Sequence, residues 1–212
     1  MGIDLNHAIG SEAKHVILVG ASVGHAWNIS ELPKRIGVTG YTFEFIGEYE
    51  FDKSEAVGQI VKRTSDKPFA VFLKECAAYF PGDFEKQKRL MQGWIEELSK
   101  NNIVPIPTTV VPVTSPDFLS IPYFKDVLKK VLPLGKVDLE KRLRFIVEYN
   151  DWIKKYSKEK GLSLLDLEAA LRRSESDRRL RADLTNGDGL HLNPKAYALL
   201  DPIVVPVLSG AK

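Results

Sequence analysis

Short apolar runs alternate along the chain with longer segments in which apolar residues recur at helical spacing. Runs of strand length cover residues 15–19, 41–46, 69–73, 103–111 and 162–167. Several of these runs are continuously apolar, which is typical of strands that are covered on both faces. The pattern therefore predicts a mostly parallel sheet of about five strands.

Helical spacing is clearest in two segments. Apolar side chains recur between Lys and Glu residues over 84–98, and 137–160 is a second long, charged amphipathic segment. Gly161 is placed where a glycine commonly ends a helix. The pair Asn193-Pro194 is typical of a helix start, with proline at the first helical position.

The alternation of strands and helices predicts helices on both faces of the sheet. No low-complexity linker or internal repeat divides the sequence, so we expect one α/β domain over residues 1–212. The proline-rich stretch 104–122 predicts a strand followed by an irregular surface loop. In open sheets of this kind, sites form beyond the carboxyl ends of the strands. The residues after the first three strands and the last loop are therefore the places to search.

Composition narrows the classes of partner. The chain has 212 residues, 44% of them hydrophobic and 27% charged, with a net charge of +2. This charge is too small to indicate nucleic-acid binding. The single cysteine, Cys76, excludes an internal disulfide framework. No Cys, His or carboxylate cluster has metal-ligand spacing and no glycine-rich nucleotide motif occurs, so we expect no metal or cofactor.

No apolar run approaches the roughly 20 residues of a membrane-spanning helix, so we expect no integral membrane segment. The first residues, MGIDLNHAIGSEAK, lack the apolar core of a signal peptide. We expect a cytoplasmic protein, or an exported one from which the signal peptide has been trimmed.

The first candidate for chemistry follows the first apolar run. Ser22 lies between Gly20 and Gly24 in a Gly-x-Ser-x-Gly pattern, the nucleophile motif of α/β-hydrolases. The glycines permit a sharp turn, and a helix start would offer free N–H groups to a developing oxyanion. The alternative is a helix-capping serine in a phosphate-binding or structural turn.

The second candidate is the segment TNGDGLHLNPKAY, residues 185–197. Asp188 and His191 lie three residues apart in a glycine-rich loop ahead of a helix. In such a turn the carboxylate can accept the imidazole Nδ1–H and leave Nε2 to act as base on a serine hydroxyl. An Asx turn with a surface histidine is the alternative.

Taken together, residues 16–24 and 185–197 resemble the first and last sequence blocks of the SGNH hydrolases, the GDSL-like lipase and acylhydrolase family. The segment 149–167 resembles the helix and strand that lead to the last block. The resemblance implies a three-layer α/β/α sandwich with flavodoxin-like strand order. It also implies Ser22 as nucleophile, His191 as general base and Asp188 as the residue that orients the histidine.

The same resemblance implies an oxyanion hole built from three donors. They are the Ser22 backbone N–H, a glycine N–H after the second strand, and an asparagine side chain after the third. Gly47 fits the glycine, although it also simply ends a strand. The chain departs from the pattern at the asparagine, where Cys76 lies nearest and offers only a weak donor.

Other residues near the strand ends carry alternative interpretations. Cys76 could itself be a nucleophile paired with His191, although a packing cysteine is commoner. Glu75 could raise the pKa of His191, or pair with Lys74 or another neighbour. His25, Trp27 and Tyr79 could line a substrate pocket or belong to the core. The arginine-rich stretches 141–144 and 172–181 could bind an anionic substrate or form solvated helix ends.

Three functions remain under consideration. The first is a serine esterase acting on a small-molecule, lipid or sugar ester. The second is an α/β-hydrolase proper, which the early position of Ser22 disfavours because that fold places several strands before its nucleophile. The third is a weakly active or inactive family member that binds a carbohydrate or a protein partner, as the missing asparagine suggests.

Overall fold

A computed structural model describes residues 13–116 and 139–211 of the chain. The sheet contains the parallel strands β1 (Lys14–Gly20), β2 (Tyr41–Gly47), β3 (Ala70–Leu73) and β4 (Val104–Pro107). Their order across the sheet is β2-β1-β3-β4. This is the start of the flavodoxin-like order, and it places β1, which leads to Ser22, between two neighbours.

Seven helices accompany the strands in the described part of the chain. They are α1 (Ser22–Trp27), α2 (Leu32–Ile36), α3 (Ser54–Val61), α4 (Phe84–Lys100), α6 (Leu139–Lys160), α7 (Leu167–Leu171) and α8 (Pro194–Gly210). Short 3-10 helices occupy Ile29–Glu31, Ala77–Tyr79 and Ala182–Leu184.

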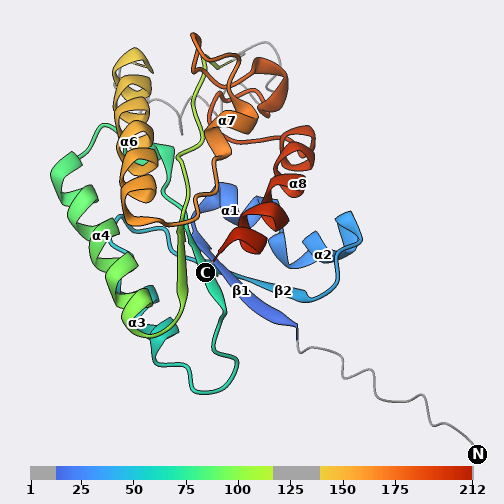
Figure 1. Cartoon of the computed structure of the whole chain (residues 1–212). Helices are drawn as coiled ribbons and strands as arrows, with labels where there is room; N and C mark the ends of the chain where they lie inside the picture. Colours follow the sequence, from blue (N-terminus) through green and yellow to red (C-terminus); the bar gives the residue numbers. More distant parts are fainter. Residues whose placement is uncertain (1–12, 117–138, 212) are drawn as a thin grey trace, which may run out of the picture.

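The helices cover both faces of the sheet, which confirms the predicted α/β/α sandwich (Figure 1). Alternation along β1 sends Val16 and Leu18 to one face, which α1, α2, α7 and α8 cover. Ile17 and Val19 point to the other face, beneath α3, α4 and α6. Four of the five predicted strand regions therefore form strands with buried cores on both sides.

The sheet has about four strands in the described residues, not about five. The predicted strand over 162–167 makes a single parallel bridge, Leu165 to Thr108. The reason lies in β4, where the N–H groups of Val104 and Thr108 point to β3. The intervening residues that face the other edge are prolines, Pro105 and Pro107, which have no N–H to donate.

The predicted helix boundaries agree with the structure. The Asn193 side chain accepts a hydrogen bond from the Ala196 N–H at 3.1 Å, with Pro194 at the first helical position of α8. Gly161 follows α6 with φ +65°, the left-handed conformation that glycine adopts easily. Residues 137 and 138 of the predicted helix lie outside the described residues.

The proline-rich stretch was predicted to continue as a surface loop, and this is wrong for its described part. Residues 108–114 have no regular structure but are buried. A buried segment without regular structure needs other partners for its backbone N–H and C=O groups, and the Asn150 side chain on α6 supplies two of them. It accepts the Val110 N–H at 2.7 Å and donates to the Val110 carbonyl at 2.9 Å. Residues 117–122 lie outside the described residues.

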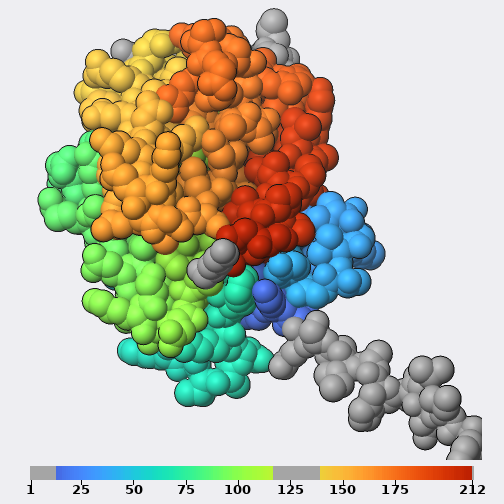
Figure 2. All heavy atoms as spheres, in the orientation of Figure 1, coloured from blue at the N-terminus to red at the C-terminus, as the bar shows by residue number. Residues whose placement is uncertain are grey.

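The C-terminal helix α8 packs beside the blue segment that carries α1 and α2 (Figure 2). A buried carboxylate, Asp201, ties these elements together. It accepts a hydrogen bond from the Trp27 Nε1–H at 2.8 Å, and its other oxygen pairs with Arg35 at 2.7 Å. Across residues 13–116 and 139–211, no helix is both long and apolar enough to cross a membrane.

Candidate active site

Ser22 is the first residue of α1, immediately beyond the carboxyl end of β1. The two flanking glycines allow close packing at this turn. A methyl group on Gly24 would lie 2.9 Å from Cε2 of Phe45, so α1 can approach β2 only because residue 24 has no side chain. The turn therefore holds the Ser22 hydroxyl at the carboxyl edge of the sheet.

The second part of the site is the loop that precedes α8. An isolated bridge between Thr185 and Leu192 closes it. Gly189 has φ +75°, and a methyl group there would lie 2.1 Å from the Thr114 carbonyl oxygen. The Thr114 N–H also donates to the Gly189 carbonyl at 3.0 Å. The buried segment 108–114 thus supports the loop directly.

These two parts meet at a short hydrogen-bonded chain of side chains. The Ser22 Oγ lies 3.0 Å from His191 Nε2, and His191 Nδ1 lies 2.6 Å from Asp188 Oδ2. Asp188 Oδ1 accepts the backbone N–H groups of Leu190 and His191, each at 2.8 Å. With Nδ1–H donating to the carboxylate, Nε2 is left as the acceptor for the serine hydroxyl.

The electrostatics suit a base next to a hydroxyl. The hydrogen bond with Asp188 raises the pKa of His191, while burial and the charge of Lys74 act in the opposite direction. Burial disfavours the charged form of Asp188, but the hydrogen bonds from His191 and the two backbone N–H groups outweigh it and lower the pKa of Asp188. Asp188 is therefore an ionised partner for the imidazole at neutral pH.

Gly47, the predicted second oxyanion donor, ends β2 opposite Gly20 in the parallel register. The Glu48 N–H donates to the Gly20 carbonyl at 2.8 Å. Because successive N–H groups along a strand point to opposite edges, the Gly47 N–H is directed away from β1.

Cys76, the predicted third donor, precedes the 3-10 helix Ala77–Tyr79 and is only 8% exposed. Its thiol makes no hydrogen bond with Ser22 or His191, all three of which are described residues. Its electrostatic neighbours include Lys74, Tyr79 and Arg142. The side chain is thus buried near the site and is not part of the hydrogen-bonded chain.

The three predicted pocket residues have different surroundings. His25 is exposed on α1, with its ring centroid 5.6 Å from that of Phe45. Tyr79 is partly buried and donates to the Glu50 carbonyl at 3.0 Å. For Trp27 the core alternative holds and the pocket alternative does not, because Trp27 is 1% exposed and packs between α1 and α8, with its N–H held by Asp201.

Glu75 pairs with Lys53, at 3.1 Å, and not with its neighbour Lys74. Burial raises the pKa of Glu75, while the charge of Lys53 lowers it. The pair lies on the face covered by α3, α4 and α6, since Lys53 also approaches the rings of Tyr79 and Trp94. The side chains that shift the pKa of His191 are Asp188 and Lys74, so the predicted effect of Glu75 is not observed.

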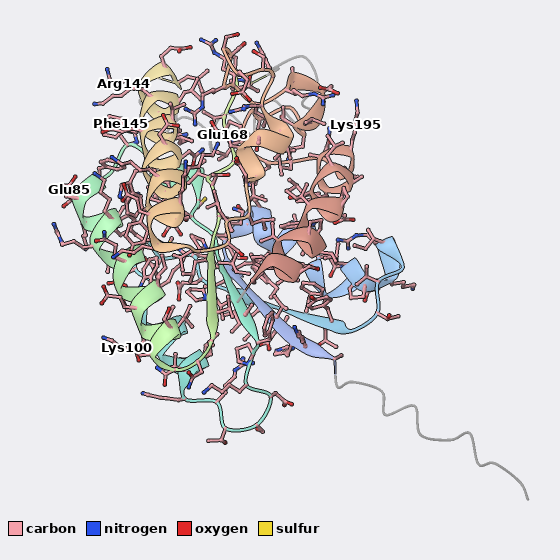
Figure 3. All side chains as sticks on the ribbon, in the orientation of Figure 1. Glu85, Lys100, Arg144, Phe145, Glu168 and Lys195 are labelled. Carbon is pink, nitrogen blue, oxygen red and sulfur yellow. The ribbon has the colours of Figure 1, made fainter. Side chains whose placement is uncertain are left out.

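The arginines of residues 172–181 are paired with acidic side chains. Glu168 on α7 (Figure 3) is fully buried, and Arg178 contacts both of its oxygens. The other pairs are Arg172–Glu175, Arg173–Asp177, Arg178–Asp151, Arg179–Glu140, Arg179–Asp177 and Arg181–Asp183. These arginines are thus engaged by acidic side chains, in a segment between α7 and the 3-10 helix Ala182–Leu184 and not at a helix end.

Sequence reasoning gave no functional role to Lys74, which is 2% exposed and follows β3 directly. Period-2 alternation would have placed it on the same face as Ala70 and Phe72. In the described part of the chain, no three His, Cys, Asp or Glu side chains are grouped as a metal site.

Known structures share this architecture. A GDSL-like lipase from Bacteroides thetaiotaomicron is 16% identical with a TM-score of 0.65, over 92% of this chain and 88% of that one. An acetyl xylan esterase is 19% identical with a TM-score of 0.63, over 92% and 99%. A variant of an acetyl-xylooligosaccharide esterase from Geobacillus is 11% identical with a TM-score of 0.61, over 93% and 94%.

No family model and no curated protein matches the sequence. The structural likeness confirms the predicted fold, that of the SGNH hydrolases and GDSL-like lipases. It also disfavours the α/β-hydrolase interpretation, because β1 is the only strand before Ser22 in the described residues.

Proposed function

We propose that this chain, which has the SGNH-hydrolase fold, is a serine esterase with Ser22 as nucleophile, His191 as general base and Asp188 as the residue that orients it. The observation that carries the proposal is the 3.0 Å approach of Ser22 Oγ to His191 Nε2, on a histidine whose other nitrogen is held by a carboxylate. This is the geometry of an activated hydroxyl nucleophile.

The reaction would proceed in two halves. Ser22 Oγ attacks the ester carbonyl carbon while His191 Nε2 takes the hydroxyl proton. The tetrahedral intermediate expels the alcohol, which receives that proton from His191, and leaves an acyl group on Ser22. A water molecule, deprotonated by His191, then attacks the acyl carbonyl, and the carboxylic acid and free Ser22 are released.

The negative charge that develops on the carbonyl oxygen in the tetrahedral intermediate needs hydrogen-bond donors close to it. The Ser22 backbone N–H at the start of α1 is one, as in the predicted oxyanion hole. The direction of the Gly47 N–H and the weakness of the Cys76 thiol leave this hole with fewer strong donors than the family resemblance implies. Because each lost donor typically costs about 10²–10³ in turnover, we expect a slow esterase.

Substrates are expected to be esters of a small molecule, a lipid or a sugar. Two of the structural neighbours are named for acetylated xylan or its oligosaccharides, which favours short acyl groups as the first substrates to examine. A series of p-nitrophenyl esters from acetate to decanoate, together with acetylated xylo-oligosaccharides, would distinguish an acetyl esterase from a lipase by the ranking of kcat/KM.

The decisive test combines active-site labelling with hydrolysis. The wild-type protein is incubated with a fluorophosphonate probe, and p-nitrophenyl acetate hydrolysis is followed in parallel for Ser22→Ala and His191→Ala. We expect one label per chain that is absent from Ser22→Ala, and a loss of at least about 10³-fold in turnover for either variant.

Ser30→Ala is the matched control, because Ser30 is exposed and hydrogen-bonds only to the nearby Asn28 side chain. This variant should label and hydrolyse like the wild type. Absence of labelling in the wild type, with hydrolysis unchanged in both site variants, would refute the proposed function.

A further inference from the structure

Lys74 lies against Gly20, next to the turn that carries Ser22. It follows β3 directly and points to the face that carries α1 and α8, because Phe72 and Ala70, two and four residues earlier, point there. A methyl group on Gly20 would lie 3.4 Å from the Lys74 Cβ and 3.6 Å from its Cδ. The lysine stem therefore runs along Gly20, two residues ahead of Ser22.

The Lys74 ammonium is buried without a carboxylate. Its side chain is 2% exposed, and its Nζ donates to the Glu75 backbone carbonyl at 3.2 Å. The nearest carboxylate in the sequence, Glu75, is instead engaged by Lys53 at 3.1 Å. No ion pair formed among residues 13–116 and 139–211 includes Lys74.

A buried ammonium without a carboxylate partner lowers the stability of the folded protein. An ammonium taken out of water needs a nearby anion to offset its lost hydration, and a single carbonyl oxygen offsets only part of it. An apolar side chain of similar length at this position would remove that cost. What the charge does contribute is a positive potential beside the reacting serine, in a site from which bulk water is partly excluded.

We propose that Lys74 is a positioning residue for the esterase reaction, whose buried positive charge stabilises the oxyanion that forms at Ser22, the task for which the family resemblance implies an asparagine after β3. Lys74 would act through the electrostatic potential at the site and not by contact with the substrate. This inference rests on the proposed esterase function.

The charged groups around Lys74 determine how it titrates. They are Glu75 and Cys76 on its own segment, Lys53 from the segment before α3, and His191 from the loop before α8. Burial lowers the pKa of Lys74 from 10.5, and Lys53 lowers it further, while Cys76 and Glu75 raise it. Lys74 in turn lowers the pKa of His191.

The pH–activity profile should therefore have two limbs, an acid limb set by His191 and an alkaline limb set by Lys74. As the pH falls, protonation of His191 removes the base. As the pH rises, deprotonation of Lys74 removes the positive charge, at a pH below that of an ordinary exposed lysine. The wild-type kcat is expected to be bell-shaped, with Lys74 responsible for the alkaline limb.

The test uses Lys74→Met, which removes the charge at similar length, and Lys74→Arg, which keeps it. Lys100→Met is the matched control, since Lys100 lies at the exposed end of α4 (Figure 3). For p-nitrophenyl acetate, Lys74→Met should lower kcat by at least about 10-fold with little change in KM, and should abolish the alkaline limb. Lys74→Arg should keep kcat near the wild-type value and also show no alkaline limb, because a guanidinium stays protonated throughout the range of the assay.

Two further measurements separate this role from a structural one. An NMR titration of the His191 ring should give a higher pKa in Lys74→Met than in the wild type, because a nearby positive charge is gone. The Tm of Lys74→Met should be equal to or above that of the wild type. If Lys74→Met does not fold, Lys74→Gln takes its place with the same expectations.

The proposal is overturned if Lys74→Met keeps the wild-type kcat, alkaline limb and His191 pKa, and in that case labelling of Ser22 still leaves the esterase function intact. It is also overturned if Lys74→Arg and Lys74→Met lose activity and Tm alike, since that indicates a packing role. If Ser22 is never labelled, the esterase function fails on its own, and an unaltered His191 titration in Lys74→Met then refutes the electrostatic link as well.

Discussion

The Ser22 hydroxyl lies 3.0 Å from His191 Nε2, although these residues belong to opposite ends of the chain. The turn after β1 holds the serine, and a loop buttressed by residues 108–114 holds the histidine. Their meeting depends on the parallel sheet, which brings the carboxyl ends of its strands to one edge.

Removal of the Asp188 charge should slow the reaction without weakening substrate binding. In Asp188→Asn the imidazole loses the acceptor that holds its Nδ1–H, so we expect kcat to fall by about 10³–10⁴ with KM changed little. Steady-state kinetics on p-nitrophenyl acetate measure this. Asp183→Asn is the control, because Asp183 pairs with Arg181 and Lys195 on the surface and should leave kcat unchanged.

The loss of activity at acid pH should be set by the pKa of His191. Its pKa is raised by Asp188, and a base must be neutral to accept a proton, so kcat/KM should fall as the pH drops through a value above 6.5. In Asp188→Asn the residual activity should have its acid limb at lower pH. An acid limb that is unchanged in this variant would contradict the assignment of the limb to His191.

The same pair makes stability depend on pH. The pKa of His191 is higher in the folded state than in the unfolded chain. The stability that this histidine contributes is therefore fully present below about pH 6.5, and it is lost as the pH rises through the pKa of the folded state. The difference in Tm between the wild type and His191→Ala should therefore be larger at pH 5.5 than at pH 9. An equal difference at both values would argue against the raised pKa.

Gly189 should tolerate no side chain. A Cβ in the left-handed conformation would collide with the Thr114 carbonyl oxygen, so Gly189→Ala should displace the loop that carries Asp188 and His191. We expect kcat to fall by about 10²-fold, since a displacement of about 1 Å can cost that much. Gly210→Ala, at an open position near the end of α8, is the control.

The buried Asp201 should contribute to stability and not to catalysis. In Asp201→Ala, Trp27 and Arg35 both lose their acceptor, and we expect the free energy of unfolding to fall by about 2–4 kcal/mol. Urea denaturation measures this. Glu159→Ala should change it by less than about 0.5 kcal/mol, because the Glu159–Lys155 pair is exposed.

Cys76 should be close to dispensable. If it contributes only a weak donor or packing, Cys76→Ala should reduce kcat by less than about 10-fold, well short of the loss for a strong oxyanion donor. A label that persists in Ser22→Ala but is lost in Cys76→Ala, together with all hydrolysis, would instead favour Cys76 as the nucleophile. Single-turnover kinetics with the fluorophosphonate probe distinguish the two.

Local patterns predicted much of the fold because their signals are short-range. Apolar runs located β1, β2 and β3, and helical spacing located α4 and α6 with Gly161 at the end of α6. The predicted fifth strand, residues 162–167, is not part of the sheet. The reason, the two prolines of β4, is also visible in the sequence. Which edge each proline of β4 faces, however, depends on how that strand pairs with β3.

The amino-acid sequence by itself determined four of the strands and the helix boundaries, because each depends on neighbours within a few residues. It also singled out Ser22, Asp188 and His191 as candidates, through two short blocks that resemble a known family. Only the tertiary structure decided the partners of charged groups after β3. Glu75 and Lys74 are adjacent in sequence but point to opposite faces, so one meets Lys53 and the other is buried near His191. Burial and charge pairing arise from packing between distant segments, and no local pattern encodes them.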